Sequence, residues 1–155
     1  MTNHNHLKNS PVGPLWVAAD SDGVTKISWS EIPSEGNVAV EKQAIQELSE
    51  YFNKSRQIFD VKVNLSGIGT PLQQKIWAQL QRVKSGEVLT YGQLGQKVGT
   101  HARAIGGAMG RNPIPIIVPC HRIVGASGKL TGYSGHGGLA TKQKLLELER
   151  TWVGK

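Results

Sequence analysis

Cys120, the one cysteine of the chain, stands beside a histidine and an arginine in the string Pro119-Cys-His-Arg122. A thiol becomes a nucleophile when it loses its proton, and a neighbouring base or cation lowers the pKa of a free cysteine from about 8.5. His121 is therefore a candidate general base. Adjacent side chains of an extended strand point to opposite faces, so contact between the two requires a turn or a bridging water. The alternative is that Cys120, which ends an apolar run, is a small core residue.

Several elements must position this tetrapeptide. The run from Ile114 to Pro119 is apolar and contains two prolines, which excludes a helix and predicts a buried extended segment. Upstream, Thr70-Pro-Leu-Gln73 and Thr90-Tyr-Gly-Gln93 both have the form of a capping box, so we expect helices to start there. The first should end at Ser85-Gly86 and the second at Val98.

A third helix is predicted from His101 to about Arg111, with Gly99 as the turn, Thr100 as the candidate N-cap and Asn112-Pro113 as the stop. Two short helices separated by a tight turn have the spacing of a helix-turn-helix. Plain helical packing produces the same spacing, so both interpretations stay open at this point. A final helix is predicted from Leu139 to about Trp152.

Residues 1–66 predict a small α/β unit of their own. Leu15–Ala19 and Val24–Ser30 read as two strands of a hairpin, Val40–Phe52 has helical apolar spacing, and Phe59–Leu65 predicts another strand. We find no catalytic constellation there and expect a structural role. The fold class is thus α/β (α+β), with domains at 1–66 and 67–155, the second of them helical.

Charge is divided unevenly between these two parts. The 155 residues carry a formal net charge of +7. Residues 1–66 hold 6 basic and 8 acidic side chains, whereas residues 67–155 hold 12 and 3. The basic surface therefore belongs to the second half and favours a polyanionic partner without identifying it.

The single cysteine excludes an internal disulfide and any zinc site built on two or four cysteines. His4 and His6 are expected to lie in a disordered amino-terminal tail rather than in a metal site. No apolar run reaches the roughly 18–20 residues that span a bilayer, and the first ten residues lack a signal-peptide core. We expect an intracellular protein, cytoplasmic or, in a eukaryote, nuclear, with no membrane, metal or cofactor.

The second half resembles a known family, the O6-alkylguanine-DNA alkyltransferases (methylated-DNA–protein-cysteine methyltransferases). The likeness covers nearly all of residues 70 to 150, and the first 66 residues match in outline. The strings that carry it are Thr70–Trp77, Leu89–Gly92, Arg103–Met109, Asn112–Pro113, Ile114–Val124, Gly132–Gly135 and Leu145–Glu149.

The resemblance implies a single-turnover repair enzyme. Cys120 would accept an alkyl group from O6-alkylguanine, and less readily from O4-alkylthymine, to form a stable thioether. His121 would be linked to the sulfur through a water, and Glu149 would orient and polarise His121. Asn112 would tie the recognition helix to the active-site turn by hydrogen bonds.

The resemblance also implies a protein that binds double-stranded DNA through the minor groove and rotates the alkylated guanine base out of the stack. We expect a monomer. Arg103 would fill the gap and Tyr91 would crowd the phosphate, although Tyr91 could equally be a packed aromatic. The pocket for the base would be bordered by Met109, Ile123, Tyr133 and Ser134. The candidate phosphate contacts are Lys75, Arg82, Lys84, Lys97, Arg103, Arg111 and Arg122.

The chain departs from the family pattern at three places. The segment between Tyr91 and Arg103 is shorter than in many members, which affects the placement of Arg103. Met109-Gly-Arg-Asn112 reverses the more familiar Arg-Gly order. The loop from Tyr133 to Gly138 is longer and adds His136, which either widens the pocket or lengthens a surface loop.

Three other functions compete with alkyl transfer. A sensor of the alkyltransferase-like type would flip the base without chemistry, but such proteins usually replace the cysteine that this chain keeps together with His121 and Glu149. A helix-turn-helix regulator would leave the Pro-Cys-His-Arg cluster without a role. A cysteine hydrolase would turn over on an ester or a peptide. The residues favour alkyl transfer.

Overall fold

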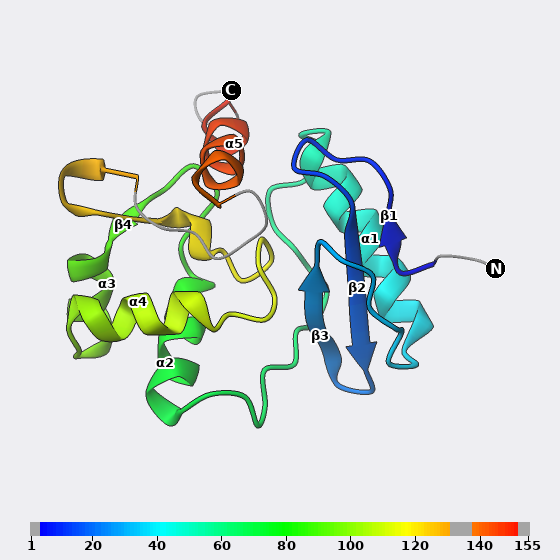
Figure 1. Cartoon of the computed structure of the whole chain (residues 1–155), viewed down its shortest axis with the longest axis horizontal. Coiled ribbons are helices and arrows are strands. Elements are labelled where there is room, and N and C mark those ends of the chain that lie inside the picture. Colours follow the sequence, from blue (N-terminus) through cyan, green and yellow to red (C-terminus); the bar gives the residue numbers. More distant parts are fainter. Residues whose placement is uncertain (1–3, 131–137, 152–155) are drawn as a thin grey trace. The chain divides into compact units, whose positions relative to one another are not determined.

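The computed structural model describes residues 4–130 and 138–151, so Tyr133, Ser134 and His136 lie outside the described part. The chain divides into two compact units, Met1–Ser66 and Gly67–Lys155. Strands and one helix form the first unit and helices dominate the second, which confirms the predicted fold class (Figure 1). None of the helices in the described residues has the length and apolar character of a membrane span.

The first unit is an antiparallel sheet with one helix packed against it (Figure 1). Its elements are β1 (His6–Leu7), β2 (Leu15–Asp20), β3 (Gly23–Ser28) and α1 (Val38–Phe52). The predicted hairpin and helix are confirmed. Gly23 sits at the turn with φ +139°, and a Cβ there would lie 2.7 Å from the carbonyl oxygen of Lys62. A side chain at this position would meet fixed backbone, so the hairpin requires glycine.

Two expectations for the first unit are wrong. Residues 59–65 form no strand, since they pair with β3 only at the bridge Val24–Val63. The physical reason is the buried carboxylate of Glu47, which accepts hydrogen bonds from the backbone amides of Asp60 and Val61 at 2.9 and 3.0 Å. His4 is not in a disordered tail, because its Nε2 lies 2.5 Å from the buried Glu41 carboxylate.

Four α-helices lie in the described residues of the second unit. They are α2 (Pro71–Leu80), α3 (Tyr91–Val98), α4 (Ala102–Gly110) and α5 (Gly138–Arg150). Both predicted capping boxes are present, at Thr70 and at Thr90, each with the reciprocal pair of hydrogen bonds to a glutamine three residues later. The first helix ends at Leu80, earlier than expected, and the next residues continue as a tighter turn.

Helices α3 and α4 pack together across a short turn. Gly95 allows the close approach, since a Cβ there would lie 2.6 Å from the carbonyl oxygen of Thr100. Gly99 ends α3 in the left-handed conformation at φ +79°. The N-cap of α4 is His101 and not the expected Thr100. Nδ1 of His101 accepts a hydrogen bond from the Ala104 amide in the first turn of α4, whereas the Thr100 amide donates to the Gly95 carbonyl.

A short parallel ladder joins distant parts of this unit, which the sequence did not indicate. It pairs β4 (Leu89–Thr90) with β5 (Ile123–Val124). Since β4 leads directly into α3 and β5 follows directly after residue 122, the ladder fixes the start of α3 next to the Cys120 segment. The indole of Trp77 donates to the Ala108 carbonyl at 2.9 Å and ties α2 to α4. Fully buried side chains of this core are Ile76, Trp77, Leu80, Leu94, Ile105, Ile114, Ile116 and Ile123.

Candidate active site

The segment before Cys120 is buried, as predicted, but it is folded rather than extended. Residues 114–119 form consecutive turns, closed by backbone bonds from Ile117 to Pro115 and from Val118 to Ile114. Ile116 has φ +75°, which is rare for a β-branched residue. Asn112 supports the turns from one side: its Nδ2 donates to the Val118 carbonyl at 2.8 Å and its Oδ1 accepts from the Ile114 amide at 2.9 Å.

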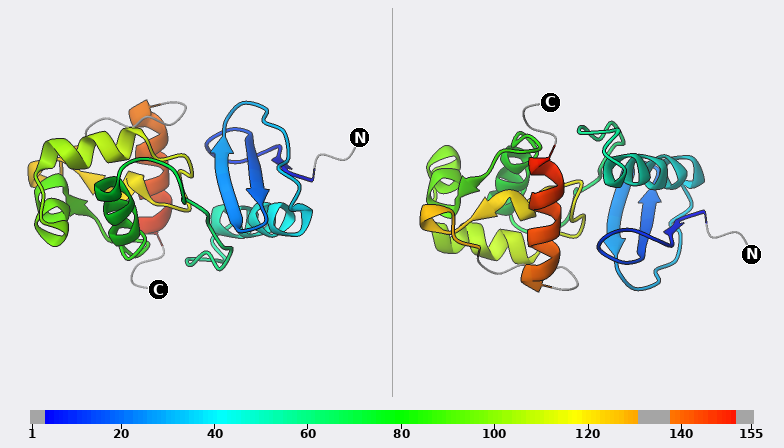
Figure 2. Two further views of the ribbon diagram at one scale, coloured as in Figure 1. Left: turned by 90° about the horizontal axis from the view of Figure 1, so that it is seen from below. Right: turned by 90° about the horizontal axis from the view of Figure 1, so that it is seen from above.

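Cys120, His121 and Arg122 form a single 3₁₀ turn, η1 (Cys120–Arg122), against which α5 packs (Figure 2). The turn replaces the extended geometry in which Cys120 and His121 would point to opposite faces. Cys120 keeps 5% of its surface exposed. Burial raises the pKa of its thiol, and a hydrogen bond from Asn112 and the charge of Lys142 partly offset this rise. The thiol is therefore mainly protonated at neutral pH and needs a base to react.

His121, the residue after Cys120, forms a buried pair with Glu149. Nε2 of His121 lies 2.6 Å from Oε2 of Glu149, and the imidazole has no exposed surface. Within residues 4–130 and 138–151, the other ring nitrogen, Nδ1, has no hydrogen-bond partner although it is buried. Arg122 adds two hydrogen bonds to the same carboxylate, from Nε to Oε1 and from Nη2 to Oε2, each at 2.9 Å.

The electrostatics of this cluster keep the imidazole neutral and the carboxylate ionised. Burial lowers the pKa of His121, and the charges of Arg122 and Lys142 act in the same direction, whereas Glu149 opposes them. Burial acts to raise the pKa of Glu149, but the hydrogen bonds of His121 and Arg122 and the charge of Arg122 outweigh it and hold that pKa far below its usual range. A neutral imidazole with one free nitrogen is able to accept a proton.

A second group of predicted residues comes together on a groove of about 690 Å³. Tyr91, the first residue of α3, lines it together with Arg103 and Gly106 of α4. Cys120 is not among the lining residues of this groove. Helix α4 exposes three glycines, Gly106, Gly107 and Gly110, and this face carries no side chains at those positions. A Cβ added at any of them would meet no heavy atom within 4 Å.

The predicted pocket residues are only partly described. Met109 lies in the last turn of α4 with 8% of its surface exposed, and Ile123 is fully buried in β5. Tyr133 and Ser134 lie outside the described residues. The structure therefore brings together His121 and Glu149, with Cys120 next to His121 in the same turn, and it brings Tyr91 and Arg103 to one groove.

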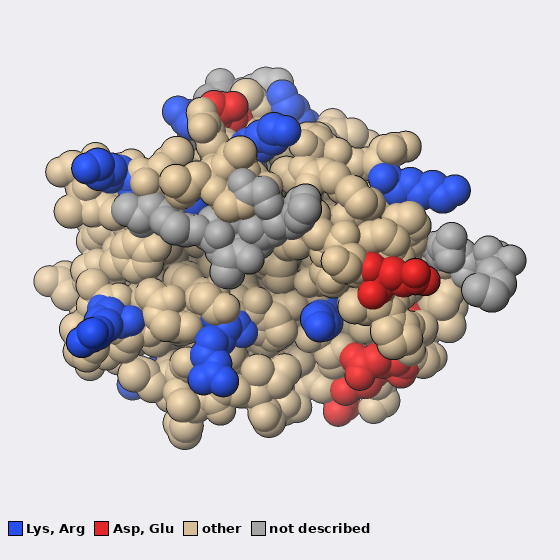
Figure 3. Space-filling view, in the orientation of Figure 1, with Lys and Arg blue, Asp and Glu red and all other residues tan. Residues whose placement is uncertain are grey.

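Two cations, Arg122 and Lys142, are buried, which the sequence did not predict. Arg122, a candidate phosphate contact, is 6% exposed and engaged with Glu149 and the Val83 carbonyl, so it is not available to DNA. The other six candidates are exposed, and basic side chains are spaced apart on the part of the surface that the second unit occupies in Figure 3. Lys142 of α5 is 1% exposed, donates to the Ile123 carbonyl at 2.5 Å and lies 6.0 Å from the Tyr91 ring centroid. Its position on a polar-looking helix gave no sequence signal.

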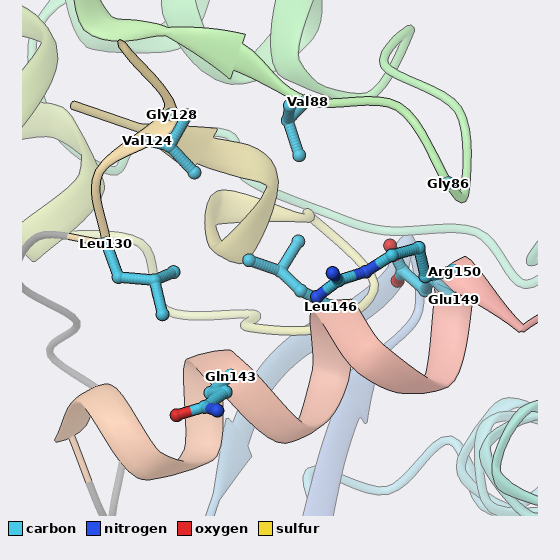
Figure 4. A pocket seen from close by; sticks show the side chains of 9 residues that line it. All are labelled: Gly86, Val88, Val124, Gly128, Leu130, Gln143, Leu146, Glu149 and Arg150. Carbon is cyan, nitrogen blue, oxygen red and sulfur yellow. The ribbon is translucent and has the colours of Figure 1, made fainter. Parts of the chain in front are cut away.

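A cavity of about 440 Å³ adjoins Glu149 (Figure 4). Its walls are mainly apolar, with Leu130 and Val124 on one side and Leu146 reaching in from α5. An apolar wall next to the carboxylate lowers the local dielectric and strengthens its bonds to His121 and Arg122. Among the described residues, no group of three or more His, Cys, Asp or Glu side chains is arranged to hold a metal ion.

The fold and site together define a cysteine-based site with a buried histidine–glutamate pair, built on a helix-turn-helix scaffold. The sequence matches the family model "6-O-methylguanine DNA methyltransferase, DNA binding domain" over residues 71–151. The model of the ribonuclease-like domain of the same family matches residues 3–65. The chain belongs to the 6-O-methylguanine DNA methyltransferase family, as its resemblance indicated.

Similar proteins cover nearly the whole chain. Relatives named methylated-DNA–protein-cysteine methyltransferase are 40% identical in Mycobacterium tuberculosis, over 96% of this chain and 93% of the relative, and in Methanosarcina acetivorans, over 90% and 94%. The crystal structure of Mycobacterium tuberculosis OGT in complex with DNA superposes with a TM-score of 0.80 at 40% identity, covering 94% of this chain and 91% of that one.

Proposed function

We propose that this protein repairs DNA by transferring an alkyl group from O6-alkylguanine, and less readily from O4-alkylthymine, to the sulfur of Cys120. The observation that carries the proposal is the buried His121–Glu149 hydrogen bond of 2.6 Å, made by the residue that follows the chain's one cysteine. It supplies a neutral base to a thiol whose raised pKa makes a base necessary. The names of the relatives, which specify a methylated DNA and a protein cysteine, support the same reaction.

The step is a single displacement at carbon. Sγ of Cys120 bonds to the alkyl carbon while the bond from that carbon to O6 breaks, and the electron pair remains on the purine oxygen. Nδ1 of His121 receives the thiol proton through a water, the departing guanine takes up one proton from solvent, and His121 then releases its added proton to solvent, so that no net proton is gained or lost. A thioether is not hydrolysed by water under these conditions, so each molecule reacts once.

The target base has to leave the duplex, because O6 lies within the base stack and Cys120 is almost buried. Arg103 would insert into the gap that the base leaves in the duplex, and Tyr91 would press against the phosphate beside it. Their shared groove next to the glycine face of α4 supports both assignments, because that face lets a minor groove approach closely. Met109, Ile123, Tyr133 and Ser134 would border the pocket for the base, and Asn112 would hold the Cys120 turn.

The second unit, 67–155, would then carry both DNA binding and alkyl acceptance, and residues 1–66 would serve as a structural domain. All residues assigned to the reaction belong to the second unit, so one chain is sufficient and a monomer is the expected active form. A DNA substrate places the activity in the cytoplasm of a prokaryote or the nucleus of a eukaryote.

The experiment is intact-mass analysis after incubation with a duplex that contains one O6-methylguanine. Transfer predicts a single gain of about one methylene, mapped to Cys120 and absent in Cys120→Ala. Tight binding of the damaged duplex without a change in mass would contradict transfer and identify the alkylated-base sensor. Release of product with repeated turnover on an ester would identify a hydrolase.

A further inference from the structure

Arg122 is buried with its guanidinium directed at two partners. Nε and Nη2 donate to the two oxygens of Glu149, each at 2.9 Å, and Nη1 donates to the Val83 carbonyl at 2.6 Å. This two-pronged contact fixes the plane of the carboxylate, which a single point contact would leave free to rotate. Oε2 of Glu149 accepts from Arg122 and lies 2.6 Å from His121, so the three side chains form one hydrogen-bonded unit.

The proton between His121 and Glu149 has two possible positions. In one arrangement Glu149 is a carboxylate and Nε2 of His121 carries the hydrogen. In the other, Glu149 is a neutral acid that donates to Nε2, and the hydrogen of the imidazole sits on Nδ1. Burial favours the second arrangement for an isolated acid, because it leaves no charge in the interior.

The two arrangements have opposite consequences for chemistry. A hydrogen on Nε2 leaves a lone pair on Nδ1, which has no partner in the described residues and can accept a proton. A hydrogen on Nδ1 removes that ability while leaving the overall geometry unchanged. The side chain that decides between them must act on Glu149, since it is the described partner of the ring.

We propose that Arg122 is a positioning residue that fixes the tautomer of His121, because its fixed positive charge and its two hydrogen bonds hold Glu149 as a carboxylate. A carboxylate has no hydrogen to donate, so Nε2 must carry one and Nδ1 stays free. The significance of this tautomer rests on the proposed function, in which His121 accepts the thiol proton. The other charged or titratable groups around His121 are Cys120 of the same turn and Lys142 of α5.

The test is NMR of the full chain labelled with ¹⁵N-histidine, in which the two tautomers give different imidazole nitrogen shifts. The wild type is expected to show hydrogen on Nε2 of His121 between about pH 6 and 9. Arg122→Met is expected to move the hydrogen to Nδ1, and Arg122→Lys, which keeps the charge, to retain most of the wild-type form. Arg150→Met is the matched control, because Arg150 is the exposed neighbour of Glu149 on α5.

A wild-type ring with hydrogen on Nδ1 overturns the proposal, and so does an Arg122→Met ring that still carries it on Nε2. If Arg122→Met does not fold, the wild-type and Arg122→Lys spectra decide. The readout needs no alkyl donor. A wild type that shows hydrogen on Nε2 but transfers no alkyl group contradicts the proposed function alone, and one that transfers with hydrogen on Nδ1 contradicts the role of Arg122 alone.

Kinetics give a second readout that a merely structural role would not move. With free O6-benzylguanine, Arg122→Met is expected to react about 100-fold more slowly than the wild type at neutral pH, the lower end of what a general base contributes. The deficit should shrink as the pH rises, because the thiol then ionises without help from His121. A deficit of the same size at every pH overturns the proposal.

Discussion

Gly106→Ala separates the stability of α4 from its contact with DNA. Gly106 lies in the interior of a nine-residue helix, and its Cβ would meet no heavy atom within 4 Å. Alanine is favoured over glycine in a helix interior by about 1 kcal/mol, so the variant should be more stable by about that amount. For a chain of 155 residues this corresponds to a rise in Tm of about 2–4 °C.

The same methyl group should weaken binding of duplex DNA. Gly106 lines the groove of Tyr91 and Arg103, so a methyl there occupies space that the minor groove would need. An extra methyl in a close-packed contact costs about 1–3 kcal/mol, which is about 5- to 150-fold in Kd. Binding is measured by fluorescence anisotropy with a labelled duplex, and stability by thermal unfolding.

Two controls make the result decisive. Ser49→Ala changes an exposed position of α1 in the first unit and should leave DNA binding unchanged. The reaction of Gly106→Ala with free O6-benzylguanine should match the wild type, since it involves no duplex. A variant that is stabilised and still binds DNA at wild-type affinity would refute the assignment of this face to DNA, and a destabilised variant would refute the open space around Gly106.

Four further outcomes are expected. Arg103→Ala should slow repair of duplex DNA far more than reaction with free O6-benzylguanine, and equal losses in a stopped-flow comparison would reject its place in the gap. Lys142→Met should raise the thiol pKa of Cys120 further by removing a nearby positive charge, seen as slower alkylation by iodoacetamide at pH 8; an unchanged pH profile would contradict this. Unfolding free energy should fall as the pH drops below 6.5, because His121 has a lowered pKa when folded and takes up its proton on unfolding. The free energy of unfolding should change by at most about 1.4 kcal/mol per pH unit. Denaturant unfolding curves at several pH values should show this dependence in the wild type and not in His121→Gln. DNA affinity should fall as salt rises, since phosphate contacts release counterions, and a flat titration would exclude an electrostatic footprint.

Local chemistry in the sequence was sufficient for much of the fold. Thr70 and Thr90 each have a glutamine three residues later, and the reciprocal hydrogen bonds that start α2 and α3 involve only those residues. Segment 59–65 could not be predicted in the same way. The Glu47 carboxylate, which accepts hydrogen bonds from the amides of Asp60 and Val61, lies on α1, and no local sequence pattern predicts this contact.

The site residues were also hard to predict where their partners are remote in sequence. Cys120 and His121 stood out because they are adjacent, whereas Glu149 is 28 residues from His121 and was named only through family resemblance. Arg122 was taken for a surface cation, since its burial depends on Val83 and Glu149, both remote in sequence. Lys142 shares a helix with exposed neighbours, and the sequence contains nothing that distinguishes it from them.

The parallel pairing of β4 with β5 and the packing of α5 against η1 have a consequence for biosynthesis. A ribosome-bound chain that has emerged as far as Val124 already contains the thiol and can close the ladder between Leu89 and Ile123. It still lacks the carboxylate of Glu149, and the ammonium of Lys142, which α5 supplies. A nascent chain is therefore expected to acquire its helix-turn-helix before the His121–Glu149 pair that would activate the sulfur.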